Sequence, residues 1–414
     1  MSRPHRIVAL ADTDSYVKWA AALLGSMPES WDVELLIVET PLAVSAAQQE
    51  AALAGSGLRA EDVRRVEYGD LTQVLSARDA DAVLVAARGP VVRVLISLVA
   101  ELDPRPVIVS GLPGISIPAT TAAMVHRMQS DMFVLHSTRE VREFARLAQR
   151  RGLTQRFGLA SLPFASPTAV RGDGGSDLVF ASQSIVPRGR VDRVRVARLL
   201  IAAARAHPER RVIVKERAAA GEHQTHAQKY SYPDLLRGLG PLPANLVVST
   251  EPMGRVLASA EGLVTVSSTA AIEAVARGIP VIALDTFGVD DALINPVFVG
   301  SGLFGSEESV VRRQFRFPDQ GWLADNYFHD PTVDDWVERL DGLVGRRRRG
   351  ALPPKAGRRR RGGRVRDVWE RKLALGHKDR TPAGYAVFAI VAPMRVVLRP
   401  LLRPYYRRKL RPSG

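Results

Sequence analysis

The chain of 414 residues contains no cysteine, which excludes disulfide bonds and thiolate metal ligands and fits a protein of a reducing compartment. A long apolar run near the N-terminus is also missing. The short run Ile7–Ala11 ends at Asp12, whereas a secretory signal needs a longer apolar core. We therefore expect this run to be a first β-strand and the protein to be cytoplasmic.

Several motifs of catalysis and nucleotide binding are absent, because the sequence has no nucleophile elbow, no P-loop and no GxGxxG. Neither the eight histidines nor the carboxylates have the spacing of metal ligands, so the sequence predicts no metal and no cofactor. His126 and His136 are possible site residues, although a lone histidine is more often structural.

The net charge of +15 is unevenly distributed along the chain. Residues 346–414 hold 22 Lys and Arg but only 3 Asp and Glu, whereas the first 345 residues hold 36 and 40. The body of the protein is therefore slightly acidic, and the basicity belongs to a C-terminal tail. This distribution removes the overall charge as an argument for nucleic-acid binding by the body.

Short buried strands alternate with helical patterns in two successive series, which predicts two parallel sheets with helices on both faces. The first series has strands at Ile7–Ala11, Val33–Val38, Ala82–Ala86, Pro106–Val109 and Asp131–His136. The second has strands at Leu178–Ala181, Arg211–Lys215, Leu246–Ser249, Leu263–Val266 and Val281–Leu284. The expected fold class is α/β, with two Rossmann-like doubly wound domains, residues 1–160 and 174–345, that face a cleft.

The basic tail divides into two parts. Residues 346–383 contain two runs of four arginines among Gly and Pro, and we expect a basic, largely disordered linker there. Residues 384–414 mix apolar and basic residues, and their apolar run is too short to span a bilayer. This composition favours an amphipathic tail on an anionic membrane surface. A helix docked on the body and a nucleic-acid-binding tail are the less favoured alternatives.

The stretch 261–285 has the pattern of a strand, a turn, a helix and a second strand. Ser267, Ser268 and Thr269 place three hydroxyls where a helix N-terminus leaves backbone N–H groups unpaired. A strand that runs into such a turn predicts an anion site at the carboxyl edge of an α/β sheet. A simple helix cap has a similar pattern, so the turn alone leaves both interpretations open.

Further polar residues follow the other strands of the second domain. Gln183 and Arg190 follow its first strand, and Lys215 ends the next. Because the carboxyl ends of parallel strands meet at one edge, these residues and the hydroxyl turn could together hold a diphosphate. Glu273, on the helix after the turn, either pairs with Arg277 or accepts hydrogen bonds from a ribose.

In the first domain, Asp12 and Asp14 follow the first strand. Either carboxylate could act as a general base toward an acceptor hydroxyl, or cap the helix that begins near Ser15. The segment Gly111–Pro118 follows a later strand, and its glycines and prolines prescribe a specific turn beside the expected cleft.

These residues carry a resemblance to GT-B glycosyltransferases. The stretch from Ser267 to Pro280 is similar to their donor site, where a hydroxyl-bearing turn holds the donor phosphates and a helical Glu often holds ribose. Gln183 with Pro187, and the strand that ends at Lys215, resemble motifs of bacterial capsule-type and polysialyltransferase-like enzymes. The whole chain is also similar to a group of uncharacterised actinobacterial glycosyltransferases.

One departure concerns the residues after Lys215, where the related enzymes usually have Pro-His and this chain has Glu216 and Arg217. Arg217 or His223 would then take the place of that histidine. The resemblance implies that a nucleotide-activated donor gives its sugar, without a metal, to a cell-envelope glycan or lipid-linked acceptor. Lys215 and Arg190 would stabilise the leaving nucleotide.

The composition of the tail, which lies outside the resemblance, favours a peripheral protein at the inner face of the cell membrane, and Asp12 or Asp14 is the candidate base. Two other functions stay open at this point. A nucleotide-sugar epimerase has the same fold but needs no acceptor, and a non-catalytic protein would act through its basic tail.

Overall fold

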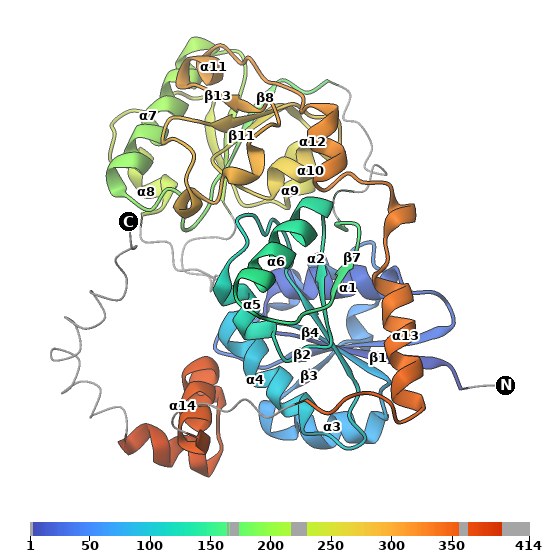
Figure 1. The fold of residues 1–414 in the computed structure, drawn as a ribbon. Helices are drawn as coiled ribbons and strands as arrows, with labels where there is room; N and C mark the ends of the chain where they lie inside the picture. The colour runs from blue at the N-terminus through green and yellow to red at the C-terminus, as the bar shows by residue number, and fades with distance from the viewer. Residues whose placement is uncertain (1–2, 164, 166–173, 217–229, 356–362, 391–414) are drawn as a thin grey trace.

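The computed structural model describes residues 3–163, 165, 174–216, 230–355 and 363–390. It contains two parallel sheets, one of seven strands and one of six, and helices cover both faces of each (Figure 1). The sheets follow one another in the chain, so the protein consists of two Rossmann-like domains. The predicted fold class is confirmed.

The first sheet has the strand order β3-β2-β1-β4-β5-β6-β7. Its strands are β1 (His5–Ala11), β2 (Trp31–Val38), β3 (Arg64–Val66), β4 (Ala82–Ala86), β5 (Val107–Gly111), β6 (Met132–Leu135) and β7 (Phe157–Leu159). The helices among them are α1 (Asp14–Gly25), α2 (Ala46–Leu53), α3 (Leu71–Arg78), α4 (Gly89–Ala100), α5 (Thr121–Arg127) and α6 (Thr138–Arg150).

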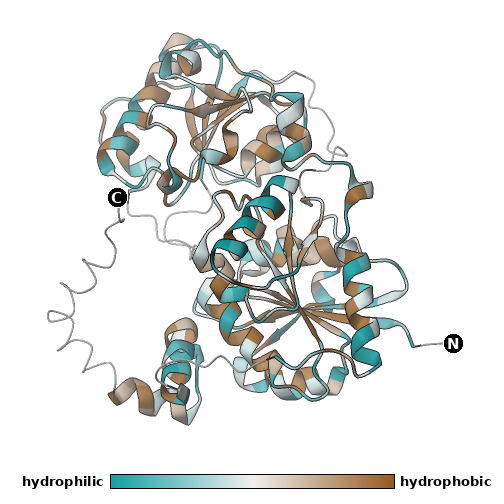
Figure 2. Cartoon of the chain, viewed as in Figure 1, coloured by the Kyte–Doolittle hydropathy of each residue, from teal (hydrophilic) through white to brown (hydrophobic). Residues whose placement is uncertain are grey.

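Strand β1 shows how the sequence produces this layering. Side chains of a strand point alternately to its two faces. Ile7 and Ala9 therefore lie in the core beneath α1 and α2, and Val8 and Leu10 in the core beneath α3 and α4. A strand that is buried on both faces has no solvent-facing positions, which explains the continuous apolar run and the apolar strands at the centre of Figure 2.

The second sheet has the strand order β10-β9-β8-β11-β12-β13. Its strands are β8 (Asp177–Ala181), β9 (Val212–Lys215), β10 (Leu246–Ser249), β11 (Ala260–Thr265), β12 (Val281–Leu284) and β13 (Phe304–Gly305). Its helices are α7 (Arg190–Ala206), α8 (Tyr232–Arg237), α9 (Met253–Leu257), α10 (Ala270–Ala276), α11 (Glu307–Val311) and α12 (Gln320–Asp325).

Helix α13 (Trp336–Arg348) follows the second sheet but completes the core of the first domain (Figure 1). Its apolar residues Trp336, Leu340 and Val344 are buried in the core of that domain, where the helix packs on β5 and β7. The prediction assigned this helix to the second domain, residues 174–345, whereas the helix packs on the first domain. The apolar spacing of this helix indicated a docked helix but not which domain it covers.

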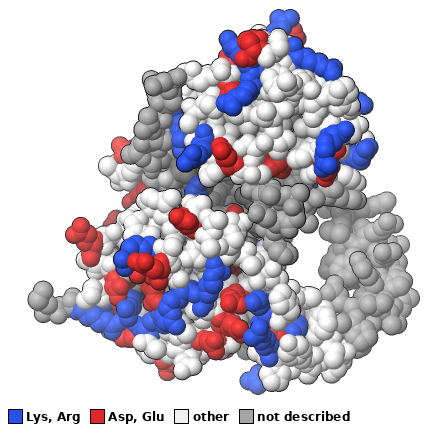
Figure 3. Space-filling model, turned by 180° about the vertical axis from the view of Figure 1, so that it is seen from behind, with Lys and Arg blue, Asp and Glu red and all other residues white. Residues whose placement is uncertain are grey.

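The predicted linker 346–383 is largely structured where the structure describes it. Arg347 and Arg348 both contact the buried carboxylate of Asp81, at 2.9 and 2.7 Å, and Lys355 lies 2.9 Å from Asp131. Acidic side chains of the first domain thus neutralise part of the basic segment, and Figure 3 shows basic and acidic groups close together on that domain. A further helix, α14 (Gly363–Leu375), packs against α4.

The membrane-surface tail was predicted for residues 384–414, of which 391–414 lie outside the described residues. Residues 382–390 are helical. Within the described part of the chain, no helix is long and apolar enough to cross a membrane.

Candidate functional site

The loop after β8 and the hydroxyl turn after β11 meet at the carboxyl edge of the second sheet. The side-chain oxygen Oε1 of Gln183 accepts hydrogen bonds from the backbone N–H and the hydroxyl of Ser267, at 3.0 and 3.1 Å. Ser267 is only 3% exposed, so Gln183 satisfies polar groups that water does not reach. The expected convergence of these two strand ends is present in the structure.

The turn itself is closed by its own hydroxyls. Thr265 Oγ1 accepts the N–H of Ser268 at 3.1 Å, and Ser268 Oγ accepts the N–H of Ala270 at 3.2 Å. Thr269 occupies the N-cap position of α10 without a side-chain capping bond. The structure therefore leaves fewer free N–H donors at the turn than the sequence pattern indicates, whereas the partly exposed hydroxyls of Ser268 and Thr269 stand at its surface.

The loop that carries Gln183 is folded around a buried arginine that the sequence analysis missed. Arg193, on α7, is 1% exposed and donates to the backbone oxygens of Gln183, Ser184, Pro187 and Tyr230. Position 193 lies three, four and seven residues before the buried Val196, Ala197 and Leu200. That helical spacing was the signal that Arg193 faces the interior.

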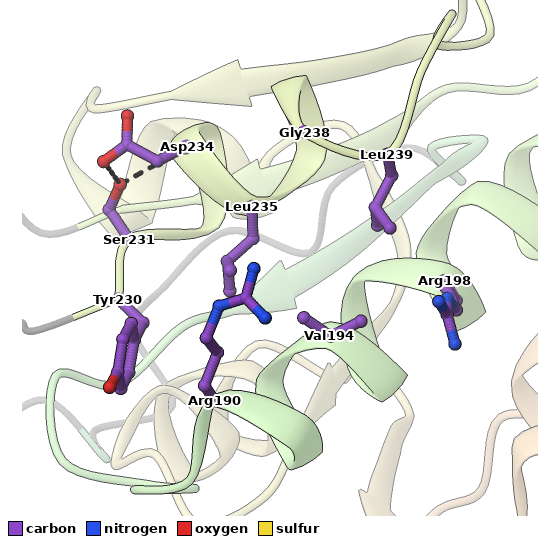
Figure 4. Close-up of a pocket in the computed structure, with 9 residues that line it drawn as sticks. All are labelled: Arg190, Val194, Arg198, Tyr230, Ser231, Asp234, Leu235, Gly238 and Leu239. Carbon is purple, nitrogen blue, oxygen red and sulfur yellow. Dashed lines mark hydrogen bonds between the residues drawn. The ribbon is translucent and has the colours of Figure 1, made fainter.

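Arg190 lies elsewhere than predicted. It is exposed at the start of α7 and lines a pocket of about 470 Å³ with Tyr230, Ser231 and Leu235 (Figure 4). Its side chain extends toward α8 in that view. Among the described residues, no contact joins it to the hydroxyl turn, because its helix position turns it away from the strand edge.

Lys215 and Glu216, at the end of β9, are both buried. The ammonium group of Lys215 donates to the backbone oxygen of Glu216. The residues proposed to replace the family histidine, Arg217 and His223, lie outside the described residues, so this part of the predicted site stays a prediction.

Glu273 makes the contact that its spacing from Arg277 predicts. Its carboxylate lies 3.6 Å from the Arg277 guanidinium, and both side chains are partly buried. Arg277 also donates to the backbone oxygen of Gly254 at 3.4 Å. Glu273 is therefore engaged with Arg277 in this structure, and the ribose contact stays a prediction.

In the first domain, Asp12 is fully buried at the end of β1. Its carboxylate accepts the backbone N–H of Arg88 at 3.2 Å and the Arg88 Nε–H at 3.0 Å. Burial raises the pKa of Asp12 to about 6, and the Arg88 contacts partly offset that rise. Asp14 is partly exposed in the first turn of α1, so it is the more accessible of the two candidate bases.

The two candidate histidines have structural roles in the described fold. Trp19 Nε1–H donates to His136 Nε2 at 2.6 Å, so the ring proton is on Nδ1, which donates to the Ala160 oxygen at 2.9 Å. Burial lowers the pKa of His136 to about 4, which keeps the ring neutral. His126 packs against Gly89, where a Cβ would approach the ring to 2.5 Å.

The segment 111–118 of the first domain reaches the hydroxyl turn of the second. A Cβ on Gly114 would lie 3.0 Å from Thr269 Oγ1, so the segment and the turn are in close contact here. The fully buried carboxylate of Glu140 holds the segment by accepting the Ser116 N–H at 2.7 Å and the hydroxyl of Tyr327, which follows α12, at 2.6 Å. Glu140 thus joins the two domains beside the turn.

Other residues of α6 strengthen this junction between the domains. Arg139 donates to the backbone oxygens of Pro296 and Val297, and Arg142 forms a two-bond ion pair with Asp325. Glu140 is not among the residues predicted from the sequence, although its spacing to the buried Phe144 and Leu147 places it on the apolar face of its helix. The described residues contain no group of three or more His, Asp or Glu that could hold a metal ion.

A family model described as "Putative glycosyltransferase (DUF6716)" matches residues 7–343 of the sequence. The chain belongs to this family. At the level of this family it is a glycosyltransferase, as the resemblance implied. No curated protein was found that matches its sequence. The closer likeness to capsule-type and polysialyltransferase-like enzymes stays a prediction.

Several solved structures of nucleotide-sugar enzymes have a similar fold. The complex of S. aureus MnaA with UDP has 11% identity and a TM-score of 0.53, and the match covers 85% of this chain and 100% of that one. UDP-GlcNAc 2-epimerase from Neisseria meningitidis, bound to UDP-GlcNAc, has 10% identity and a TM-score of 0.53, with 82% and 98% covered. At such low identity these likenesses concern the fold, which is the two-domain GT-B arrangement.

Proposed function

We propose that this protein transfers a sugar from a nucleotide-activated donor to a cell-envelope glycan or a lipid-linked acceptor. Family membership supports the reaction class. The observation that carries the proposal is the approach of Gly114 to Thr269, because it brings the carboxyl edges of the two sheets together at the hydroxyl turn. In an open α/β sheet, ligands bind at that edge.

On the donor side, the diphosphate would lie against the turn after β11. The hydroxyls of Ser268 and Thr269 would donate to phosphate oxygens, and Gln183 would hold the turn in shape through Ser267. Lys215 would add positive charge at the end of β9, which is separated from β11 by β8. Such fixed donors and charges stabilise the negative charge that develops on the leaving nucleotide, so the proposed transfer needs no metal.

On the acceptor side, a base must take the proton of the attacking hydroxyl. We assign this role to Asp14, because it is partly exposed beside the end of β1. Asp12 is enclosed and bound to Arg88, so in this structure its carboxylate orients the start of α4. Replacing Asp14 with Asn should abolish transfer and leave nucleotide binding intact, whereas equal transfer by the variant would move the role to another residue.

The protein would work as a peripheral protein at the cytoplasmic face of the membrane, where lipid-linked acceptors lie. Residues 384–414 support this location, because they are apolar and basic and contain no acidic residue. Liposome flotation with and without these residues tests it, and unchanged flotation on anionic lipid would contradict the location.

The direct test of the donor claim is a thermal-shift screen with UDP, GDP, dTDP and CMP and their sugar derivatives. A ligand present at 100 times its Kd raises the unfolding free energy by about 2.7 kcal/mol. Stabilisation by one nucleotide class supports the proposal. If none of these nucleotides or nucleotide sugars stabilises the protein, the donor claim is wrong. Isomerisation of the sugar in the absence of any acceptor would identify an epimerase of the same fold instead.

A further inference from the structure

Residues 363–390 form a pair of helices that is docked on the first domain. α14 is followed by a short turn and by the helical stretch 382–390. The two helices contact each other through Trp369 and Phe388, whose rings stack with centroids 5.9 Å apart. The ammonium group of Lys372 lies 3.9 Å from the ring centroid of Tyr385. We call residues 363–390 the C-terminal helix pair.

The C-terminal helix pair is attached to the body by both apolar and charged contacts. Leu375 is fully buried in the core beneath α3 and α4. Glu370 forms a 2.5 Å ion pair with Arg93 of α4, and both side chains are mostly buried. At the turn, the buried carboxylate of Asp379 accepts from Arg371 at 3.0 Å. This mixture of contacts makes the pair a fixed part of the first domain.

The attachment lies at the carboxyl edge of the first sheet. Lys378 pairs with Glu39, directly after β2, and Arg380 pairs with Glu67, directly after β3. Next to Glu39, the hydroxyl of Thr40 contacts the backbone oxygen of Asp12 at 3.5 Å. The helix pair is therefore attached at the same edge as the proposed acceptor side, and Figure 1 shows α14 beside α4 on the first domain.

The opposite side of the helix pair presents large apolar residues to the outside. Val365, Trp369 and Leu373 follow one another at intervals of four along α14, so they share one stripe of the helix. Phe388 stacks on Trp369 and extends this stripe onto the second helix. Within the described residues, the side chains of Val365, Leu373, Phe388 and nearby Tyr385 and Ile390 are 46–63% exposed. A contiguous apolar patch that is exposed to solvent marks an interaction site.

Charge indicates which partner covers this patch. The stretch 381–390 has no charged residue, and the chain continues into residues 391–414 with seven Lys and Arg and no Asp or Glu. Apolar residues beside a purely basic segment match the two parts of an anionic lipid surface, namely its acyl boundary and its headgroups. An acidic protein partner would satisfy the basic segment but not the apolar stripe.

We propose that the apolar face of the C-terminal helix pair, formed by Val365, Trp369, Leu373, Tyr385, Phe388 and Ile390, docks on anionic lipid and turns the carboxyl edge of the first sheet toward the bilayer. The inference rests on the proposed function for its biological meaning, because this orientation brings a lipid-linked acceptor to the side of Asp14. A basic tail that only tethers the protein would leave its orientation on the membrane free, whereas this docking face fixes the orientation.

Tryptophan fluorescence of the full chain tests the docking face. The other four tryptophans are at most 6% exposed, so quenching by vesicles of phosphatidylglycerol and brominated phosphatidylcholine reports on Trp369. We expect quenching in the wild type and none in Trp369→Phe. Leu373→Glu places a charge on the exposed stripe without touching the core, and should weaken vesicle binding by about tenfold or more.

The orientation is tested with single cysteines, which the cysteine-free chain allows. A dye on Ala43→Cys, in the loop after β2, lies at the carboxyl edge of the first sheet. A dye on Gly342→Cys, in α13 beside His5 and Asp341, lies at the amino edge. The edges are separated by the seven-residue strand β1, roughly 20 Å. Energy transfer to a lipid dye should be stronger from position 43.

The outcomes separate this proposal from its alternatives. Absent quenching, or full binding by Leu373→Glu, overturns it. Flotation without quenching would mean that residues 391–414 bind lipid alone, and a dimer that Leu373→Glu dissociates would mean that a second copy covers the face. Equal energy transfer from both dyes would overturn the orientation. None of these assays uses a nucleotide, so docking that is observed in a protein without transferase activity would refute the proposed function and leave the surface intact.

Discussion

Gln183 offers the sharpest test of the donor side, because its structural and functional roles can be separated by two substitutions. In Gln183→Leu the N–H and hydroxyl of the buried Ser267 lose their acceptor. An unsatisfied buried polar group costs about 1–3 kcal/mol. In a domain of this size, a loss of about 2 kcal/mol lowers Tm by about 4–8 °C. Nucleotide affinity should fall together with stability, because the turn loses its fixed shape.

Gln183→Glu should keep the fold and lose the ligand. Its carboxylate accepts the same two hydrogen bonds from Ser267, so unfolding in urea should change by less than about 1 kcal/mol. A carboxylate at about 5 Å from phosphate charge, at an effective dielectric constant of about 20, is repelled by about 3 kcal/mol per unit charge. That repulsion corresponds to a loss of affinity of more than about 100-fold.

The assay is isothermal titration with the nucleotide found in the thermal-shift screen, combined with urea unfolding of both variants. Nucleotide binding by Gln183→Glu at wild-type affinity would place the diphosphate away from this turn. A large loss of stability in Gln183→Glu would show that the charge disturbs the turn itself, and the argument from phosphate repulsion would fail.

Three further predictions concern other residues. Because burial raises the folded pKa of Asp12 to about 6, the folded state keeps a proton that the unfolded state releases between about pH 4 and 6. Stability from this group is lost as pH rises, and the unfolding free energy of Asp12→Asn relative to wild type should increase by on the order of 2–3 kcal/mol from pH 4 to 7. Tyr327→Phe removes a donor to the buried Glu140 and should lower the unfolding free energy, measured in urea, by about 1.5–3 kcal/mol. An unchanged urea midpoint would mean that this hydrogen bond does not stabilise the junction between the domains. Glu273→Gln should lower nucleotide affinity about tenfold, yet cost less than about 1 kcal/mol of stability; equal losses would leave Glu273 only its contact with Arg277.

Much of the fold could be predicted from the sequence, because strands buried on both faces are short, continuously apolar runs. Ala82–Ala86, Leu246–Ser249 and Val281–Leu284 have the predicted bounds in the structure. β3, β7 and β13 were missed because each is only two or three residues long. The meeting of the strand ends at one edge of the sheet was predictable from the parallel topology alone.

The site was predictable only where position in the chain determines position in space. Gln183 and Ser267 follow strands, so the sheet brings them together. The direction of the Arg190 side chain depends on its position around helix α7, which the position of a strand end does not determine. In the structure it extends toward α8. Helix spacing indicates that Arg193 and Glu140 face the interior, but it does not reveal which backbone groups they hold.

The C-terminal segment shows a different limit of composition. Its arginines and glycines are typical of disorder, and the sequence therefore predicted a disordered linker for 346–383. In the structure, Asp81 and Asp131 of the first domain supply the acidic partners of Arg347, Arg348 and Lys355. Partners that lie 200 or more residues away in the chain determine whether such a segment is ordered, and local composition does not contain them.

The central claim is tested most directly by following a labelled sugar. The full-length protein is incubated with a radiolabelled nucleotide sugar chosen by the thermal-shift screen and with bacterial membranes that contain lipid-linked and glycan acceptors. We predict release of the free nucleotide together with transfer of label to the membrane or glycan fraction, and loss of both in Asp14→Asn. Label that remains entirely on the nucleotide, whether unchanged or isomerised, would contradict the account.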